Sequence, residues 1–313
     1  MRSTPRRLAL LVSLVMGLSL ALAPAVTAHG ARLPTRIDLP DGWQPEGIES
    51  LGPWLYAGSL ANGAIWRGNA ITGKGRVLVP GMTGRVAVGL HLDHRGRLWV
   101  AGGPTGTVRV YSAFSGRLLK TYQFTGTGFL NDLDISRNRV VVTDSMNAQV
   151  GVIPLGRLGR LPSQSAMRLL PLSGDYQHQP GFNANGIAAR GRFLVIVQSG
   201  TGFLFRLNPA TGATRRIDTG GYLVTNGDGL EFRGRTLYVV RNRLNIVAVL
   251  RLSESLLRAR LVGEITQPAG VLSVPTTATV TLGGLYVVNA RFGVPPTPTT
   301  DYWINRLPLR PDA

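Results

Sequence analysis

The chain has 313 residues, of which 44% are hydrophobic, and it contains 40 glycines and 20 prolines. It has no cysteine, which excludes disulfides, zinc thiolate sites, iron–sulfur clusters and cysteine nucleophiles. The formal charge of +18 favours polyanionic partners, but no run of basic and aromatic residues follows the pattern of a nucleic-acid-binding module, so we expect no nucleic acid partner.

The N-terminal segment has the features of an export signal. Three arginines precede an apolar stretch from Leu8 to about Ala23, and small residues up to Ala28 follow it. We therefore predict a signal peptide over 1–28 and a secreted or extracytoplasmic domain over 29–313. An uncleaved membrane anchor is the alternative, because the apolar stretch is long.

The charge of the mature chain remains high. Removing Arg2, Arg6 and Arg7 from +18 leaves +15. One interpretation is electrostatic association with an anionic cell envelope, an attraction that should weaken with salt. We favour the other interpretation, a compositional preference for arginine, since the only lysines are Lys74 and Lys120.

Beyond the signal segment, short stretches of one kind recur along the chain. Each begins with a triad that leads into an apolar run. The triads start at Glu46, Val88, Asn131, Asn185, Asp228 and, more loosely, Thr276, at steps of 42, 43, 54, 43 and 48 residues. A repeat of 40 to 50 residues is typical of a β-propeller.

The runs within each unit predict a blade of four strands. The second runs are short, apolar and bounded by turn residues: Leu55–Ala57, Leu98–Val100, Val140–Val142, Leu194–Ile196, Leu237–Val239 and Leu285–Val287. The last unit lacks a clear fourth strand, and Thr35–Leu39 is expected to supply it and close the ring. The predicted fold is therefore all-β, a single six-bladed β-propeller domain.

The step of 54 residues contains about eleven extra residues before Asn185. Loops in this position lie over the mouth of a propeller channel, so we predict that Tyr176 and His178 bind substrate. Asp175 and Phe182 belong to the same predicted lid or wall. An ordinary solvated insertion is the alternative.

Strand alternation predicts that residues at one phase of the innermost strands point into the central channel at the same height. Four polar residues share this phase: Glu46, Asn131, Asn185 and Asp228. Two carboxylates and two amide oxygens form a set suited to Ca²⁺, Mg²⁺ or Mn²⁺. The alternative is a channel of solvated polar groups filled with water.

The order of these motifs resembles that of the senescence marker protein, gluconolactonase and luciferin-regenerating enzyme family of six-bladed propellers. The resemblance covers nearly the whole mature chain. It rests on Pro45-Glu46-Gly47, Asn131-Asp132, Asn185-Gly186 and Asp228-Gly229, in this order in successive units, and on the hairpin Asp93–Trp99.

The resemblance implies a metal-dependent hydrolase of a lactone or related cyclic ester. It implies that Glu46, Asn185 and Asp228 bind a divalent metal, that Asn131 lies beside the metal and binds substrate, and that Asp228 is the candidate catalytic base. Ca²⁺ is expected first, with Mg²⁺, Mn²⁺ or Zn²⁺ as alternatives. Phe129 stands where sugar-lactone members have an arginine, so the resemblance does not extend to recognition of a sugar acid.

The alternative function is a non-catalytic propeller that binds a small ligand or associates with the cell envelope, and in either case we expect a monomer. His91 and His94 flank Asp93 with the spacing of a metal motif. We interpret Asp93–Arg97 as a hairpin turn instead, because strand alternation separates the two histidine rings.

Overall fold

The structure is a computed structural model that describes residues 32–311. The predicted signal peptide, residues 1–28, lies outside the described residues. Within the described part, no helix is long and apolar enough to cross a membrane.

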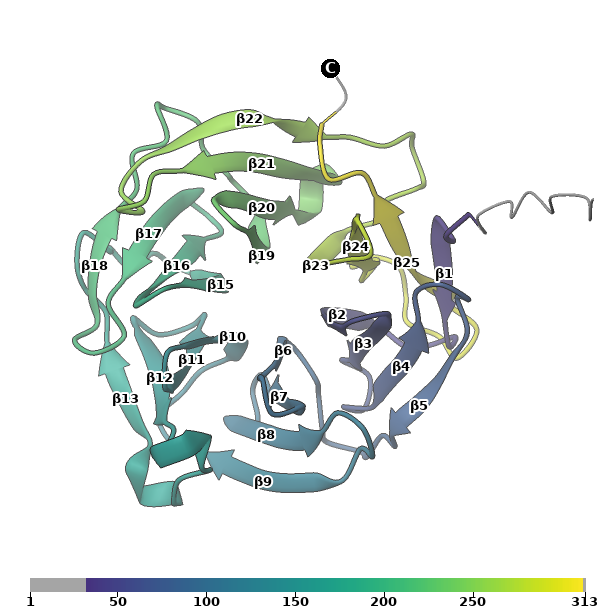
Figure 1. Ribbon diagram of the computed structural model, residues 1–313, viewed down its shortest axis with the longest axis horizontal. Coiled ribbons are helices and arrows are strands. Elements are labelled where there is room, and N and C mark those ends of the chain that lie inside the picture. The colour runs from purple at the N-terminus through teal and green to yellow at the C-terminus, as the bar shows by residue number, and fades with distance from the viewer. Residues whose placement is uncertain (1–31, 312–313) are drawn as a thin grey trace, which may run out of the picture. The chain divides into compact units, whose positions relative to one another are not determined.

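Six antiparallel sheets are arranged as blades around a central channel, as the sequence predicts (Figure 1). From the channel outward, blade 1 contains β2 (Pro45–Leu51), β3 (Trp54–Ser59), β4 (Ile65–Asn69) and β5 (Gly75–Val79). Blade 2 contains β6 (Leu90–Leu92), β7 (Arg97–Ala101), β8 (Thr107–Ser112) and β9 (Leu118–Gln123). Blade 3 contains β10 (Leu130–Ser136), β11 (Arg139–Asp144), β12 (Gln149–Pro154) and β13 (Arg168–Pro171).

The remaining blades follow the same order. Blade 4 contains β15 (Ala184–Arg190), β16 (Phe193–Gln198), β17 (Phe203–Leu207) and β18 (Ala213–Arg216), and β14 (Ser173–Gly174) pairs parallel with β18. Blade 5 contains β19 (Gly227–Arg233), β20 (Thr236–Arg241), β21 (Ile246–Leu252) and β22 (Ala259–Ile265). Blade 6 contains β23 (Pro275–Thr281), β24 (Gly284–Asn289), β25 (Tyr302–Leu307) and β1 (Arg36–Leu39). Three short 3-10 turns are η1 (Arg157–Gly159), η2 (Gln164–Ala166) and η3 (Asn242–Leu244).

The hydrophobic core is divided among the spaces between adjacent blades. The second run of each unit forms the second strand of its blade, as predicted, and its residues are buried on both faces. Each cluster of buried apolar side chains joins two neighbouring blades. The blades are therefore held together by burial of apolar side chains between their faces, and the axis itself is left free for polar groups.

The N-terminal strand β1 closes the ring, which confirms the prediction. It pairs antiparallel with β25, with Ile37 opposite Ile304 and Leu39 opposite Tyr302. Ile37 and Leu39 are buried, and they pack with residues of blades 6 and 1. The first and last strands of the propeller therefore belong to one sheet, and the last blade gains its fourth strand.

Five of the six innermost strands carry a β-bulge where the repeated triads begin, and β6 is shorter and begins at the third triad residue. In blade 3, Leu130 pairs with Asp144 and Leu133 with Val142, so β10 advances three residues while β11 advances two. The same shift occurs in β2, β15, β19 and β23. Because the extra residue reverses the alternation, the first residue of a triad and the residue three positions later both face the channel.

Glycine in the second position of a triad is required by the close approach of neighbouring inner strands. A Cβ added at Gly186 would lie 2.0 Å from the carbonyl oxygen of Asp228, and one at Gly47 would lie 2.3 Å from that of Val88. Adjacent backbones therefore touch at the axis, and this fixes the height of each triad relative to the next.

The extra residues between units three and four do not all lie where the sequence suggests. Thirteen residues, 155–167, connect β12 to β13 and include η1 and η2, whereas five residues connect β4 to β5. The insertion therefore extends mainly the outer hairpin of blade 3, at the rim of the propeller (Figure 1). Only the segment 172–183 leads toward the channel.

Replacement of Gly186 by alanine should lower the free energy of unfolding by about 1–3 kcal/mol, because the new methyl group overlaps a backbone carbonyl that cannot move alone. Gly200→Ala is the matched control, since a Cβ there meets nothing within 4 Å. Urea unfolding of both variants measures the difference. Equal midpoints would show that the inner strands are not in close contact.

Candidate functional site in the central channel

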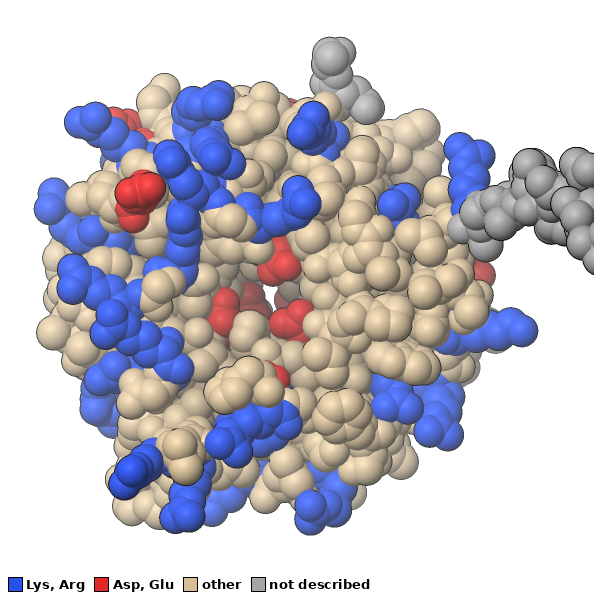
Figure 2. Space-filling model, viewed as in Figure 1, with Lys and Arg blue, Asp and Glu red and all other residues tan. Residues whose placement is uncertain are grey.

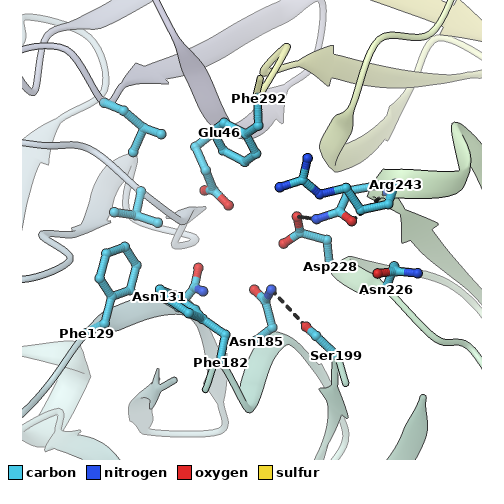
Figure 3. A pocket seen from close by; sticks show the side chains of 13 residues that line it. Glu46, Phe129, Asn131, Phe182, Asn185, Ser199, Asn226, Asp228, Arg243 and Phe292 are labelled. Atoms are coloured by element: carbon cyan, nitrogen blue, oxygen red, sulfur yellow. Dashed lines mark hydrogen bonds between the residues drawn. The ribbon is translucent and has the colours of Figure 1, made fainter. Parts of the chain in front are cut away.

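A cavity of about 350 Å³ opens at one end of the channel, where the inner strands begin. Four polar residues at the first triad position line it, namely Glu46, Asn131, Asn185 and Asp228. They come from blades 1, 3, 4 and 5, and Figure 3 shows their side chains pointing toward one another. We call these four residues the pocket ring. The structure thus brings together the four channel residues singled out in the sequence.

The two asparagines of the pocket ring are oriented by serines that directly follow the adjoining second strands. The hydroxyl of Ser145 donates to the carbonyl of Ala184 at 2.7 Å, so its oxygen accepts from Nδ2 of Asn131 at 2.9 Å. Ser199 likewise donates to the carbonyl of Gly227 at 2.6 Å and accepts from Nδ2 of Asn185 at 3.1 Å. The amide nitrogens are thereby engaged, and the amide oxygens are directed to the cavity.

Three buried oxygens of the pocket ring have no hydrogen-bond donor within the described part of the chain. They are Oε2 of Glu46, Oδ1 of Asn131 and Oδ1 of Asn185. A buried polar atom without a partner costs free energy, so such atoms signal a missing ligand, ion or water. Three acceptors and no donor at one point fit a cation.

The carboxylates of the pocket ring are difficult to ionise without a counter-charge. Burial raises the pKa of Glu46 well above its usual value, and the nearby Asp228 and Asp132 raise it further. Burial also raises the pKa of Asp228 to about 7, although hydrogen bonds from neighbouring amides act in the opposite direction. A bound divalent cation would favour the charged forms of both groups.

Asp228 is held from the side by η3. The amide of Asn242 donates to Oδ2 of Asp228 at 2.8 Å, and the Oδ1 atom of Asn242 accepts from the backbone of Arg243 at 2.6 Å. The guanidinium of Arg243 reaches the cavity beside Asp228 (Figure 3). It is the cationic side chain among the cavity-lining residues.

Tyr176 and His178 do not line this cavity. Tyr176 is buried in the core between blades 3 and 4, where its ring packs against Phe205 with centroids 5.3 Å apart. His178 lies beside Asn183, with Nε2 at 3.4 Å from the amide nitrogen. Phe182 of the same segment does line the cavity. The segment therefore reaches the site through Phe182, and the other two residues support the segment.

The donor set of the pocket ring is unusual in containing amides. Among residues 32–311, no group of three or more His, Cys, Asp or Glu side chains is arranged to hold a metal. The pocket ring has two carboxylates, and its other oxygens belong to asparagines. Any cation bound there would rely on those amide oxygens and on water.

A second group of charged residues lies farther along the channel, three positions after the first triad residues. It consists of Glu49, His91, Asp134 and Glu231, which we call the far cluster. Each carboxylate accepts from a backbone nitrogen of the next blade: Glu49 from Leu92, Asp134 from Ala189 and Glu231 from Val280. The far cluster therefore joins neighbouring blades.

His91 bridges two carboxylates of the far cluster. Its Nδ1 lies 3.2 Å from Oε2 of Glu49, and its Nε2 lies 3.1 Å from Oδ1 of Asp134. Both nitrogens must donate in this arrangement, so the ring is an imidazolium. Burial alone would lower the pKa of His91, but Asp134 and Glu49 outweigh it and Glu231 adds to them, and the pKa rises from 6.5 to about 10.

The hairpin interpretation of Asp93 is confirmed. The carbonyl of Asp93 accepts from Gly96 at 3.0 Å, and its carboxylate accepts from the backbones of Arg95 and Arg97. Asp93 therefore stabilises the turn in which it stands, while His91 points into the channel.

Several residues of the channel could not be assigned from the sequence. The residues of the far cluster stand three positions after the first triad residues, and this spacing is visible in the sequence. Simple strand alternation, however, would place residues three positions apart on opposite faces of the strand. Ser199 repeats only in Ser145 of the preceding blade, and Arg243 and Phe292 carry no repeated signal, because they stand on loops and turns. The bulge explains the first omission, and loop geometry explains the others.

Charge is distributed unevenly on the face that holds the cavity. Figure 2 shows acidic side chains in the central hollow and Lys and Arg side chains spread over the surrounding surface. The carboxylates of the channel therefore lie inside a basic surround. The channel carboxylates therefore attract a small cation at short range, and the surrounding Lys and Arg side chains attract larger anions.

No protein-family model matches this sequence, and no curated protein matches it. Solved structures do resemble the fold. The allergen Mala s 1 of Malassezia sympodialis is 16% identical, with a TM-score of 0.66 over 88% of this chain and 96% of that chain. Virginiamycin B lyase from Staphylococcus aureus is 13% identical, with a TM-score of 0.58 over 80% of each chain. A chain in the structure of a nidogen–laminin complex is 17% identical, with a TM-score of 0.59 over 77% of this chain and 86% of that chain.

These likenesses support the propeller fold alone. The three proteins differ in kind, as an allergen, an enzyme and a component of a protein complex. The sequence comparisons give no support for the gluconolactonase family in particular. The function must therefore be argued from the channel.

The raised pKa of His91 makes the stability of the propeller depend on pH. Folding favours the charged form of His91. The resulting contribution to stability is fully present below the unfolded pKa of 6.5, and it is lost as the pH rises through the folded pKa of about 10. His91→Gln should therefore be less stable than wild type at pH 6, and the difference should shrink steadily up to pH 10. Glu49, Asp134 and Glu231 are the charged groups that face His91.

Thermal melts of both proteins across this range measure the effect. His94→Gln is the matched control, because His94 is exposed on the adjacent turn. A difference between wild type and His91→Gln that stays constant with pH would show that His91 is neutral in the folded protein.

Proposed function

We propose that this protein is an exported hydrolase that uses a divalent cation in the pocket ring to open a lactone or related cyclic ester. The observation that carries the proposal is the set of unpartnered oxygens of Glu46, Asn131 and Asn185, which converge on one cavity. The order of the triads and the family resemblance support the same assignment. Export rests on the sequence of residues 1–28.

The residues present fit a hard cation. Glu46, Asn185 and Asp228 would hold it, and Asn131 would lie beside it. Oxygen ligands of this kind suit Ca²⁺ best, with Mg²⁺, Mn²⁺ or Zn²⁺ as alternatives. The serine partners of the asparagines keep both amide oxygens in place before any ligand arrives, which lowers the cost of ordering the site.

Hydrolysis of a lactone requires a water molecule, a base and stabilisation of the carbonyl oxygen. When bound, the cation supplies polarisation of the carbonyl and favours the oxyanion. Asp228 is the candidate base: it lines the cavity, and Asn242 fixes its carboxylate by donating to Oδ2 at 2.8 Å. Oδ1 of Asn131 is a free acceptor that can orient the attacking water or a substrate hydroxyl.

The reaction is balanced without a further reagent. The water oxygen bonds to the carbonyl carbon and the ring C–O bond breaks. The proton taken from water by Asp228 is returned to the departing ring oxygen, so the product is a hydroxy acid. The protein thus needs to hold water, base and carbonyl in one cavity. The pocket ring supplies Asp228 as the base and Oδ1 of Asn131 as an acceptor for the water, and a bound cation would hold the carbonyl oxygen.

Virginiamycin B lyase, a propeller of similar fold, is an enzyme, so this architecture is compatible with an active site. A non-catalytic protein that binds a small ligand or the cell envelope would use the same fold, and the cavity alone does not separate these functions. Activity measurements do.

Cation binding should depend most on the charged members of the pocket ring. Asp228→Ala should weaken Ca²⁺ and Mn²⁺ binding by about a hundredfold or more, because it removes a charge and an oxygen, whereas Asn131→Ala should retain much of the affinity. Isothermal titration measures both. Glu254→Ala, which removes an exposed carboxylate, is the matched control. Identical titrations for wild type and Asp228→Ala would exclude the pocket ring as the cation site.

Lactone hydrolysis should require the cation. A panel of five- and six-membered lactones, assayed by proton release, should show turnover that a chelator lowers by roughly a hundredfold and that added Ca²⁺ restores. The Asp228→Ala variant should be inactive at all cation concentrations. Turnover that the chelator does not change, or no turnover across the panel, would favour the non-catalytic function.

A further inference from the structure

The wall of the cavity opposite Asp228 is apolar. Three phenylalanines line it, Phe129, Phe182 and Phe292, and they come from loops of three different blades. Leu60 and Val88 complete this side. Figure 3 shows Phe292 beside Glu46, and Phe129 and Phe182 on the side of the cavity near Asn131. We call Phe129, Phe182 and Phe292 the aromatic wall.

Two rings of the aromatic wall are exposed to water. Phe182 is 51% exposed and Phe292 is 36% exposed. Water in contact with two aromatic rings is unfavourable, and a ligand that covers the rings recovers this free energy. Phe129 and Phe182 already pack edge to face, with centroids 5.2 Å apart. A flat apolar group could extend this packing.

The backbone at Phe129 is fixed by a buried carboxylate. Asp144 accepts from the backbones of Gly128 and Phe129 at 3.1 and 3.0 Å, and the carbonyl of Phe129 accepts from Ser145 at 2.9 Å. Asp144 also accepts from Asn147 and Gln149, and these bonds lower its pKa although burial acts in the opposite direction. Phe129 is thus presented by a rigid loop.

The backbone at Phe182 is fixed by a buried amide. Asn183 is fully buried, and its Nδ2 donates to the carbonyls of Gln179 and Gly181 at 2.6 and 2.7 Å. Its Oδ1 accepts from the backbone of Gln179 and from the amide of Gln198, both at 2.8 Å. The segment that carries the exposed ring of Phe182 is therefore held in place by the hydrogen bonds of a buried side chain. Such support for exposed apolar surface indicates a binding wall.

We propose that the substrate is a lactone that carries an aromatic or alkyl substituent, which packs on the aromatic wall while the ester faces the pocket ring. The proposal deepens the proposed function and rests on it for the reacting group. The part of the proposal that concerns the apolar substituent is tested by binding, without turnover. A cavity of about 350 Å³ limits the ligand to a small molecule, with room for one ring and a substituent of similar size.

A polyhydroxylated lactone suits this cavity poorly. Hydroxyls placed against the aromatic wall would lose their hydrogen bonds to water and gain none, because the side chains there are hydrocarbon. Asp228 and Arg243 lie across the cavity from Phe129, and Glu46, Asn131 and Asn185 lie between these two sides. The two sides therefore match a ligand with one apolar end and one ester end.

Binding tests the ligand class without turnover. Two six-membered lactams serve as probes, because an amide ring resists hydrolysis: a δ-valerolactam with a phenyl substituent at C6, and glucono-δ-lactam. Isothermal titration of the Ca²⁺-loaded protein should show the phenyl lactam binding at least tenfold more tightly. Equal affinities, or tighter binding of the sugar lactam, would overturn the proposal.

Variants locate the apolar end. Phe182→Ala should weaken binding of the phenyl lactam by roughly tenfold, because it removes half of the edge-to-face pair, and Phe182→Leu should restore part of the loss. The melting temperature should not change, since the ring is half exposed. Phe114→Ala is the matched control, because Phe114 is 65% exposed on an outer hairpin. Unchanged binding in Phe182→Ala would overturn the proposal.

Hydrolysis of the matched lactones separates the two proposals. If δ-valerolactone with a phenyl substituent is opened and glucono-δ-lactone is not, both hold. If neither is opened but the phenyl lactam still binds through Phe182, the ligand class holds and catalysis fails. If glucono-δ-lactone is opened faster, the hydrolase stands and the substrate class proposed for the aromatic wall is wrong.

Discussion

The structure depends on the contact between the six inner strands at the axis. Their backbones approach so closely that a methyl group at Gly186 would overlap a neighbouring carbonyl. This contact fixes the first triad residues at one height, and a bulge in five of the six inner strands turns two side chains per strand toward the axis. The pocket ring and the far cluster are thus products of one backbone feature, repeated from blade to blade.

The two ends of the channel handle buried carboxylates in different ways. In the far cluster, an imidazolium lies between Glu49 and Asp134, and backbone nitrogens of the next blade satisfy the remaining oxygens. In the pocket ring, Arg243 lies beside Asp228 and favours its charged form, but Oε2 of Glu46 and the amide oxygens of Asn131 and Asn185 have no donor among the described residues. A protein side chain lies between the carboxylates at one end, while the other end leaves three oxygens for a ligand.

The fold and the pocket ring could be predicted because both repeat. The second strands are continuous apolar runs, and Glu46, Asn131, Asn185 and Asp228 share one phase, so neither needs long-range information. Residues outside the repeat could not be placed. Tyr176 was predicted as a substrate residue because its segment leads to the channel, yet only the three-dimensional path of that segment decides that Phe182 reaches the cavity and Tyr176 enters the core.

Closure of the ring by β1 makes the order of synthesis matter. Arg36 and Asp301, which form an ion pair across the closing sheet, are 265 residues apart, so the sheet that seals the propeller joins the start of the domain to its end. Five blades can form before that pairing exists, but the sixth cannot. Folding therefore reaches completion only after the C-terminal strand has emerged, and until then the edge of β1 remains available for wrong partners.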